Sequence, residues 1–243
     1  MREPALHVGT AGWSVPAQYA DDFPAGGTHL ERYARRLNAA EINSSFYRPH
    51  RHATYERWAA SVGADFRFAV KLPKTITHQQ RLVDYDALLA RFLEEAGGLG
   101  GKLGVLLVQL PPSLRFDAGI VDAFFRDLRK RTKADIACEP RHATWFDGKA
   151  DALLKKRRVA RVAADPAPAQ GAGEPGGWEG LVYWRMHGSP RMYYSDYDAT
   201  ALAALARRVA SRRAKGARAW CIFDNTAAFF ALGNALSFAS RPA

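Results

Sequence analysis

The amino-acid sequence predicts an α/β protein, a TIM-type (β/α)8 barrel of parallel strands. Eight short apolar runs each end in polar or charged residues, and most of the gaps between them contain a helix-like stretch. The chain length of 243 residues and the 48% hydrophobic content match a single barrel of about 250 residues. Because the functional residues of such barrels lie just after the strands, the ends of the runs predict one polar mouth.

The eight strands are expected at residues 6–8, 39–43, 66–71, 103–110, 134–139, 159–165, 181–187 and 218–224. Helices are expected at residues 28–37, 54–60, 85–96, 118–131, 150–157, 200–214 and 226–237. The first of them begins with a capping box, in which Thr28 and Glu31 bond to each other's backbone. Residues 166–180 are so rich in Gly and Pro that no helix is expected after the sixth strand. Residues 1–243 are therefore expected to form a single domain.

The apolar content of the chain indicates a cytoplasmic protein with no membrane partner. No run approaches the roughly 18 apolar residues of a membrane span, and residues 1–8 lack the apolar stretch of a signal peptide. Cys138 and Cys221 both fall in predicted strands without CxxC spacing. They are therefore expected to be buried thiols rather than disulfide or zinc ligands, and no cofactor is predicted. The sequence carries no signal for an oligomeric state.

The net charge of +11 raises the question of nucleic-acid binding. The densest basic runs, at residues 126–133, 155–161 and 207–218, each come at the end of a predicted helix immediately before a strand. In a (β/α)8 barrel this position is the face opposite the mouth, where cations complement helix C-termini. We therefore expect these runs to be solvated helix ends.

Polar residues follow the second and third predicted strands. Glu41 and Asn43 are two residues apart, so they offer a carboxylate and an amide on one side of the strand. Lys71 is expected to point inward, and His78 follows it closely. Two structural alternatives remain for these residues: Glu41 as a buried acid neutralised by a cation of another strand, and Lys71 as the partner of Glu41 or Glu139.

The fourth and fifth strands end in Gln109 and in Glu139-Pro140-Arg141-His142. Gln109 is expected to orient a ligand or a neighbouring acid. Glu139 and Arg141 share one face with His142 close behind, which makes Glu139 the best candidate for a reactive carboxylate. The alternative is a structural ion pair of Glu139 with Arg141 or Arg185.

The seventh and eighth strands complete the predicted mouth. Arg185 and His187 lie on one side of their strand, and together they suit a planar anion such as phosphate or carboxylate. Asp224 and Asn225 follow the eighth strand. Either of these two residues has the alternative role of capping a turn or the next helix.

Several ordered motifs resemble those of the YecE-like proteins, domain of unknown function family 72. They extend over almost the whole chain and include GTAGW at 9–13, EINSSFY at 41–47, FAVKLP at 68–73, QLPP at 109–112, EPRH at 139–142, RMHG at 185–188 and FDNT at 223–226. The resemblance implies a TIM barrel with family-typical polar residues at the strand ends, and it supplies no activity. Asn is usual in the family where Asp224 stands here.

Together these residues predict an enzyme, a hydrolase or another acid/base enzyme, with a metal-free site for a small anionic substrate. The expected catalytic residues are Glu139, Glu41, His187 and His78. The expected ligand-binding residues are Asn43, Lys71, Gln109, Arg141, His142, Arg185, Asp224, Asn225, Trp13 and Tyr47.

Two alternatives to this enzyme belong to other functional classes of protein. A metal-dependent, nuclease-like phosphodiesterase is opposed by the absence of an HxH or HExxH pair and by the cations expected in the mouth. A nucleic-acid-binding protein would bind phosphates through Arg and Lys of the mouth loops and stack bases on Trp13, Tyr47 or Trp145.

Overall fold

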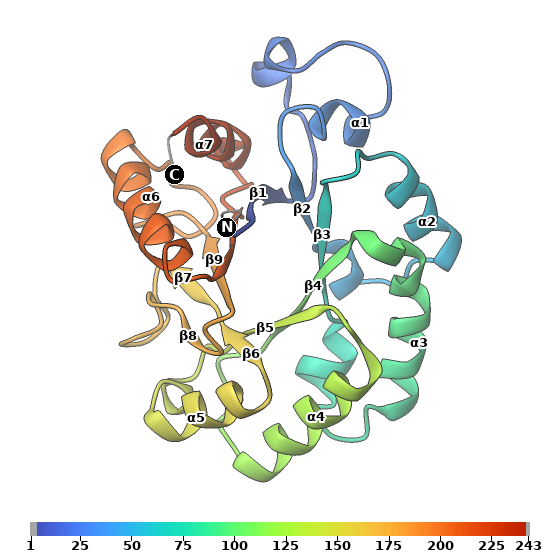
Figure 1. Cartoon of the computed structure of the whole chain (residues 1–243), viewed down its shortest axis with the longest axis vertical. Helices are drawn as coiled ribbons and strands as arrows, with labels where there is room; N and C mark the ends of the chain where they lie inside the picture. The colour runs from blue at the N-terminus through green and yellow to red at the C-terminus, as the bar shows by residue number, and fades with distance from the viewer. Residues whose placement is uncertain (1–3, 242–243) are drawn as a thin grey trace.

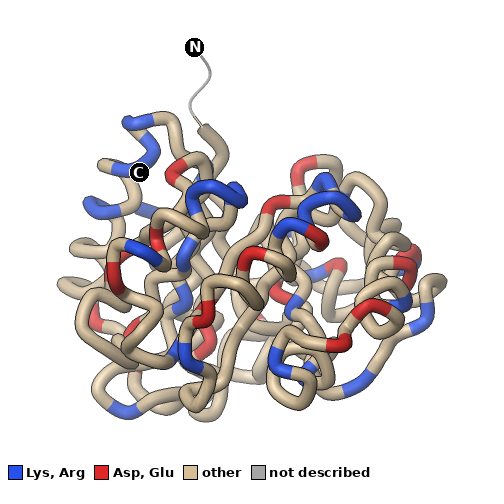
Figure 2. The backbone as a smooth tube through the Cα atoms, turned by 90° about the horizontal axis from the view of Figure 1, so that it is seen from below, with Lys and Arg blue, Asp and Glu red and all other residues tan. Residues whose placement is uncertain are grey.

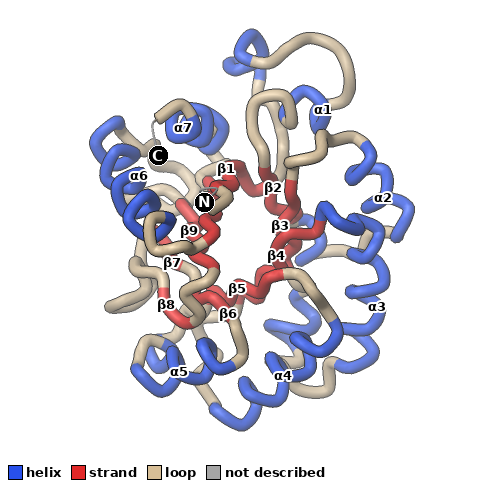
Figure 3. Tube along the Cα trace, in the orientation of Figure 1, coloured by secondary structure: helices blue, strands red, loops and turns tan. Residues whose placement is uncertain are grey.

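The computed structural model describes residues 4–241, in which a central ring of strands is surrounded by helices (Figures 1 and 3). Residues 1–3 and 242–243 of the predicted domain, and with them the first part of the segment tested for a signal peptide, lie outside the described residues. One sheet holds all the described strands in the order β7-β9-β10-β1-β2-β3-β4-β5-β6-β8. The predicted TIM-type barrel is confirmed.

The strands are β1 (Leu6–Ala11), β2 (Ala39–Ile42), β3 (Arg67–Lys71), β4 (Leu103–Gln109), β5 (Asp135–Glu139), β6 (Val159–Arg161), β7 (Ala163–Asp165), β8 (Gly176–Gly177), β9 (Leu181–Met186) and β10 (Arg218–Phe223). The α-helices are α1 (His29–Tyr33), α2 (His52–Ala60), α3 (Asp86–Ala96), α4 (Ala118–Arg131), α5 (Gly148–Lys156), α6 (Ala199–Arg213) and α7 (Phe230–Ala239). Short 3-10 or π turns follow several strands, among them Ser44–Phe46, Thr75–Gln79 and Ala143–Trp145.

The ring closes through the predicted sixth strand, which is divided into β6 and β7 on either side of Val162. β6 pairs in parallel with β5, and β7 pairs in parallel with β9, so one bent strand joins the two halves of the barrel. The expectation that every strand is parallel is wrong for β8, whose two glycines pair antiparallel with β6. Residues 166–180 contain no helix, as the density of Gly and Pro predicts.

Small residues inside the barrel leave room for two large aromatic rings. Ala39, Ala69 and Ala137 share the interior cluster with Tyr183 and Trp220, all of them buried. The two rings stack with their centroids 5.8 Å apart. Because side chains alternate across a strand, the next inward residue of each strand lies one layer nearer the carboxyl end of the barrel. In β2, β3, β5 and β9 those next residues are Glu41, Lys71, Glu139 and Arg185, whereas in β10 Ile222 comes first and Asp224 follows the strand, so the mouth is polar.

The helices cover the outside of the ring, with two clear differences from expectation. α1 has the expected capping box at Thr28 and Glu31, but the helix ends at Tyr33 rather than continuing to residue 37. α7 begins at Phe230 instead of residue 226, after Phe229 adopts a left-handed backbone conformation that no helix interior tolerates. None of the helices within residues 4–241 combines the length and the apolar character needed to cross a membrane.

The three basic runs lie at the C-terminal ends of helices, just before the amino ends of the following strands. This face of the barrel is opposite Glu139, which lies at the carboxyl end of β5. Many of the cations in these runs are paired locally. Arg157 bonds Asp122 at 2.6 Å, and Arg218 bonds Asp135 at 2.9 Å. Figure 2 shows Asp and Glu interspersed among Lys and Arg along the chain. The pattern agrees with solvated, partly neutralised helix ends.

Candidate functional site

Arg185 of β9 is the centre of a buried ionic cluster at the carboxyl end of the barrel. Its side chain is 1% exposed. Nε and Nη2 donate to the two carboxylate oxygens of Glu41 from β2, at 3.0 and 2.6 Å. Nη1 donates to Glu139 of β5 at 2.6 Å, and Nη2 also donates to Asp224, just after β10, at 3.0 Å. One guanidinium therefore holds three carboxylates from three different strands.

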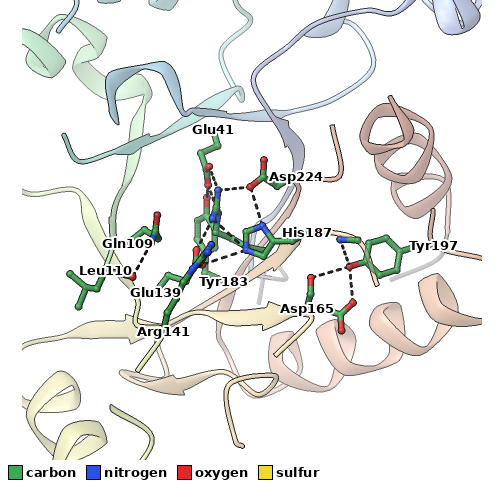
Figure 4. Close-up of polar contacts among 12 residues, drawn as sticks. Glu41, Gln109, Leu110, Glu139, Arg141, Asp165, Tyr183, His187, Tyr197 and Asp224 are labelled. Carbon is green, nitrogen blue, oxygen red and sulfur yellow. Dashed lines mark hydrogen bonds and ion pairs between the residues drawn. The ribbon is translucent and has the colours of Figure 1, made fainter. Parts of the chain in front are cut away.

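Glu139 is shared by three cationic side chains. Besides Arg185, Arg141 donates to its Oε1 through Nε and Nη2 at 3.0 and 2.9 Å. His187 Nε2 lies 3.4 Å from the same oxygen (Figure 4). Burial alone would raise the pKa of Glu139, but the charges of Arg185 and His187 hold that pKa well below its ordinary value. Glu139 is therefore an ionised carboxylate at neutral pH.

His187 joins Glu139 to Asp224. Its Nδ1 lies 3.0 Å from Oδ2 of Asp224. Burial and Arg185 lower the pKa of His187, but Glu139 and Asp224 outweigh them and raise it above the ordinary value. The same contacts, together with Arg185, lower the pKa of Asp224 against its burial. The two carboxylates thus stabilise the protonated form of the imidazole between them.

Glu41 is fixed from below by Tyr183, whose hydroxyl donates to Oε2 at 3.0 Å. Burial and the Glu41 charge raise the pKa of Tyr183, so the phenol stays protonated and remains a donor. The ring stacked on Trp220 therefore positions its hydroxyl under the carboxylate. Both structural alternatives foreseen for the acids are present here: Glu41 is paired with Arg185, and Glu139 with Arg141 and Arg185.

Lys71, at the carboxyl end of β3, differs from the other cations of the mouth. Its residue is 6% exposed, yet within residues 4–241 its ammonium group makes no ion pair or hydrogen bond. Nζ instead lies 4.1 Å from the centre of the Phe46 ring. Burial and the charge of Arg185 lower the pKa of Lys71 to about 8, although Glu41, Glu139 and Asp224 oppose the shift. The expected direct pairing of Lys71 with Glu41 or Glu139 is absent among the described residues.

His78 lies beside the same aromatic ring. Its imidazole meets Phe46 edge to face at 4.9 Å, and its Nδ1 lies 2.9 Å from the Thr77 hydroxyl. Burial, Lys71 and Arg141 all lower the pKa of His78, so the half-buried ring is neutral near pH 7. His78 is therefore a neutral imidazole in the mouth, beside the same Phe46 ring that Lys71 contacts.

Gln109 and Asn43 also lie at strand ends. The Gln109 amide is 6% exposed and donates to the Leu110 carbonyl at 2.8 Å. The buried Asn43 Oδ1 has no hydrogen-bond partner among residues 4–241. Asn43 and Glu41 line a cavity of about 280 Å³ beside the cluster, together with Trp13. Asn43 itself begins a 3-10 turn, so the predicted second strand is one residue too long.

Among the described residues, the remaining expected site residues make no hydrogen bond or ion pair with the cluster, although Trp13 lines the cavity beside it. The His142 ring caps a turn by accepting from the Thr144 backbone, and the Asn225 amide bonds Asn234 of α7 at 2.8 Å. Trp13 packs against Trp58, and Tyr47 is 67% exposed. The proposed stacking role of Trp145 is excluded, because that ring is fully buried and its indole N–H donates to Leu114.

Two tyrosines of the loop after β9 were not foreseen. The Tyr193 ring lies edge-on to His187 at 5.8 Å, and Tyr193 joins Glu139 in raising the pKa of Arg141 against its burial. The Tyr197 hydroxyl donates to Asp165 at 2.7 Å and accepts from the Gly188 backbone at 2.8 Å (Figure 4). Both tyrosines follow the seventh predicted strand, in a loop at the carboxyl end of the barrel. Loops at this end commonly supply functional residues, so this position is the sequence signal that could have identified them.

The fold and the site define the class of this protein: a TIM barrel with a buried ionic cluster at the carboxyl ends of its strands. This chain belongs to the family described as protein of unknown function DUF72, whose model matches residues 7–243. It is 31% identical over 173 residues to the UPF0759 protein YecE of Escherichia coli K12, a match that covers 69% of this chain and 61% of YecE.

Two solved DUF72 structures are similar over almost their whole length. The protein from Enterococcus faecalis V583 is 22% identical, with a TM-score of 0.79 and coverage of 96% of this chain and 94% of that one. The protein from Thermotoga maritima MSB8 is also 22% identical, with a TM-score of 0.78 and coverage of 97% and 98%. At this identity, these likenesses support the fold.

Proposed function

We propose that this protein is an enzyme that binds a small anionic substrate, bearing a phosphate or carboxylate, at the carboxyl-terminal mouth of the barrel. The proposed chemistry is acid/base catalysis without a metal ion. The observation that carries the proposal is Lys71, a buried ammonium group with no anionic partner among the described residues. A buried cation without a partner is costly, and an anionic ligand removes that cost.

The balance of charge supports an anionic ligand. The carboxylates of Glu41, Glu139 and Asp224 are already bonded to Arg185, and two of them also contact Arg141 or His187. With Lys71 and His187 both protonated, the four cations Arg141, Arg185, Lys71 and His187 exceed the three carboxylates by one charge. The ligand would contact Lys71 and Arg141, while Arg185 would act by holding the acids in place.

The acid/base roles follow from the direction of each pKa shift. Glu139 stays ionised, so it would stabilise a positive charge that develops on the substrate rather than act as an acid. The protonated form of His187 is stabilised within the cluster, so this imidazole would act as a proton donor. His78, neutral and half-buried, would serve as the base nearest to solvent.

The nuclease-like alternative is disfavoured by the position of Arg185. A divalent metal in the mouth would need the same carboxylates that the guanidinium now binds, and it would lie beside three other cationic side chains.

Thermal-shift measurements with inorganic phosphate, citrate and a panel of phosphorylated and carboxylated metabolites test the proposal. A ligand at 100 times its dissociation constant stabilises the folded state by about 2.7 kcal/mol, which raises Tm by several degrees. We expect Lys71→Met to weaken binding roughly 10- to 150-fold through loss of a charge-assisted contact of about 1.5–3 kcal/mol. Lys74→Met, an exposed lysine of the same loop, is the matched control and should bind normally.

Glu139→Gln separates chemistry from binding. It should keep ligand binding and abolish turnover once a substrate is found. A panel that never raises Tm, or an equal rise in wild type and Lys71→Met, would overturn the anionic-substrate proposal.

A further inference from the structure

Lys71 has the surroundings of a nucleophilic amine. Its stem continues the inner face of β3, its Nζ lies over the Phe46 ring, and its residue is 6% exposed. A lysine becomes a nucleophile when it is desolvated or placed next to another cation, because both effects favour the neutral amine. Lys71 meets both conditions, since it is buried and lies within the field of Arg185.

We propose that the Nζ amine of Lys71 forms an imine with an aldehyde or ketone group of the substrate, an inference that rests on the proposed anionic-substrate site. The substrate class is thereby narrowed to small carbonyl compounds that carry a carboxylate or phosphate.

The chemistry of the step balances without a redox partner. The lone pair of the neutral amine attacks the carbonyl carbon, and the carbonyl oxygen takes up a proton to give a carbinolamine. The hydroxyl then leaves as water with a second proton as the C=N bond forms. Both hydrogens of the amine leave with the carbonyl oxygen, and one further proton from solvent gives the cationic iminium.

The buried cluster suits the iminium product. Glu41, Glu139 and Asp224 each favour a positive charge on Nζ. Their fixed carboxylates would therefore stabilise the iminium cation, while burial increases the fraction of Lys71 that is a free amine before the reaction. Arg185 and His187 hold these carboxylates in place. The carboxylates therefore cannot move to form an ion pair with Lys71, which would favour its protonated, non-nucleophilic form.

Reductive trapping tests the inference on the full-length protein. Glyoxylate, an aldehyde with a carboxylate, is added with sodium cyanoborohydride at about pH 8, where half of the Lys71 side chains are unprotonated. The reduced product is a carboxymethyl-lysine, located by peptide mass spectrometry. We expect modification of Lys71 at least about tenfold faster than of exposed Lys74, because an ordinary lysine has roughly 100-fold less free amine at this pH.

Two variants and a second aldehyde test whether the fast modification depends on the Lys71 amine and on the negative charge of glyoxylate. Lys71→Arg keeps the cation and removes the nucleophile, so it should abolish the fast modification while circular dichroism shows a folded protein. Lys74→Arg should leave that modification unchanged. Propanal, a neutral aldehyde, should trap Lys71 more slowly than glyoxylate.

The outcomes distinguish the two proposals. Equal trapping of both aldehydes at Lys71 would support the imine and count against the anionic substrate. No preferential trapping of Lys71 by either aldehyde would overturn the imine, and a thermal shift with phosphate or citrate would then still support the anion site.

Discussion

Arg185 shows at the residue scale how one side chain organises a buried site. Its guanidinium donates to Glu41, Glu139 and Asp224, which belong to different strands or follow them. Desolvating four charged groups is costly, and bonding them to one another offsets that cost only while every partner is present. The sequence predicted which of these residues face the mouth, because alternation along a strand is a local property.

Arg185→Met is expected to lower the free energy of unfolding by about 3–5 kcal/mol, because three carboxylates lose their shared partner in the protein interior. Urea unfolding monitored by circular dichroism measures the change. Arg191→Met, at an exposed position of the next loop, is the control and should change stability by no more than about 0.5 kcal/mol. Equal stability of the two variants would show that the cluster contributes little to folding.

At the scale of elements, α1 links the first two strands through one buried hydroxyl. The Tyr33 hydroxyl accepts from the Thr10 backbone and donates to the Ala39 carbonyl, each at 2.8 Å. The strands approach so closely here that a Cβ at Gly9 would lie 1.9 Å from the Ala39 oxygen. This short helix therefore supplies hydrogen bonds that the β1–β2 ladder lacks.

Tyr33→Phe should destabilise the protein by about 1–3 kcal/mol, since it leaves a buried backbone donor and a buried acceptor without this partner. Thermal and urea unfolding provide the measurement. Tyr47→Phe is the matched control, because the Tyr47 side chain is largely exposed, and it should be close to neutral. A neutral Tyr33→Phe would mean that water or a shifted ladder satisfies both backbone groups.

For the whole molecule, the ionic cluster connects β2, β5, β9 and β10 across the mouth of the ring. Its titration should therefore appear in global stability. The pKa values of Glu139 and Asp224 are lowered on folding, so their stabilisation is present above the unfolded-state values near 4 and is lost as pH falls through the folded values. The pKa of His187 is raised, so its contribution is complete below about 6.5 and declines as pH rises through the folded value.

We expect the free energy of unfolding to fall steeply below about pH 4 and the slope to be shallower in Glu139→Gln, which has one carboxylate fewer to protonate. Urea unfolding across a series of acidic buffers gives the two profiles. His187→Asn should lose the decline above pH 6.5, and its acid slope should also be shallower, because His187 helps to lower the pKa values of Glu139 and Asp224. Identical acid slopes in wild type and Glu139→Gln would contradict the lowered pKa of this carboxyl.

The sequence by itself determined the barrel, the strand ends that form its mouth, the capping box of α1 and the helix-free segment after the sixth strand. Each depends on local periodicity or backbone chemistry, which neighbouring residues carry. Tertiary structure decided which side chains pair. Arg185 bonds all three carboxylates, so the Lys71 ammonium lies against the Phe46 ring instead. The Asn225 amide bonds Asn234 of α7. Tertiary structure also decided where β6 ends and β7 begins. Partners such as Glu41 and Arg185, 144 positions apart, meet only when the ring closes, so no local pattern records which cation an inward acid will bind.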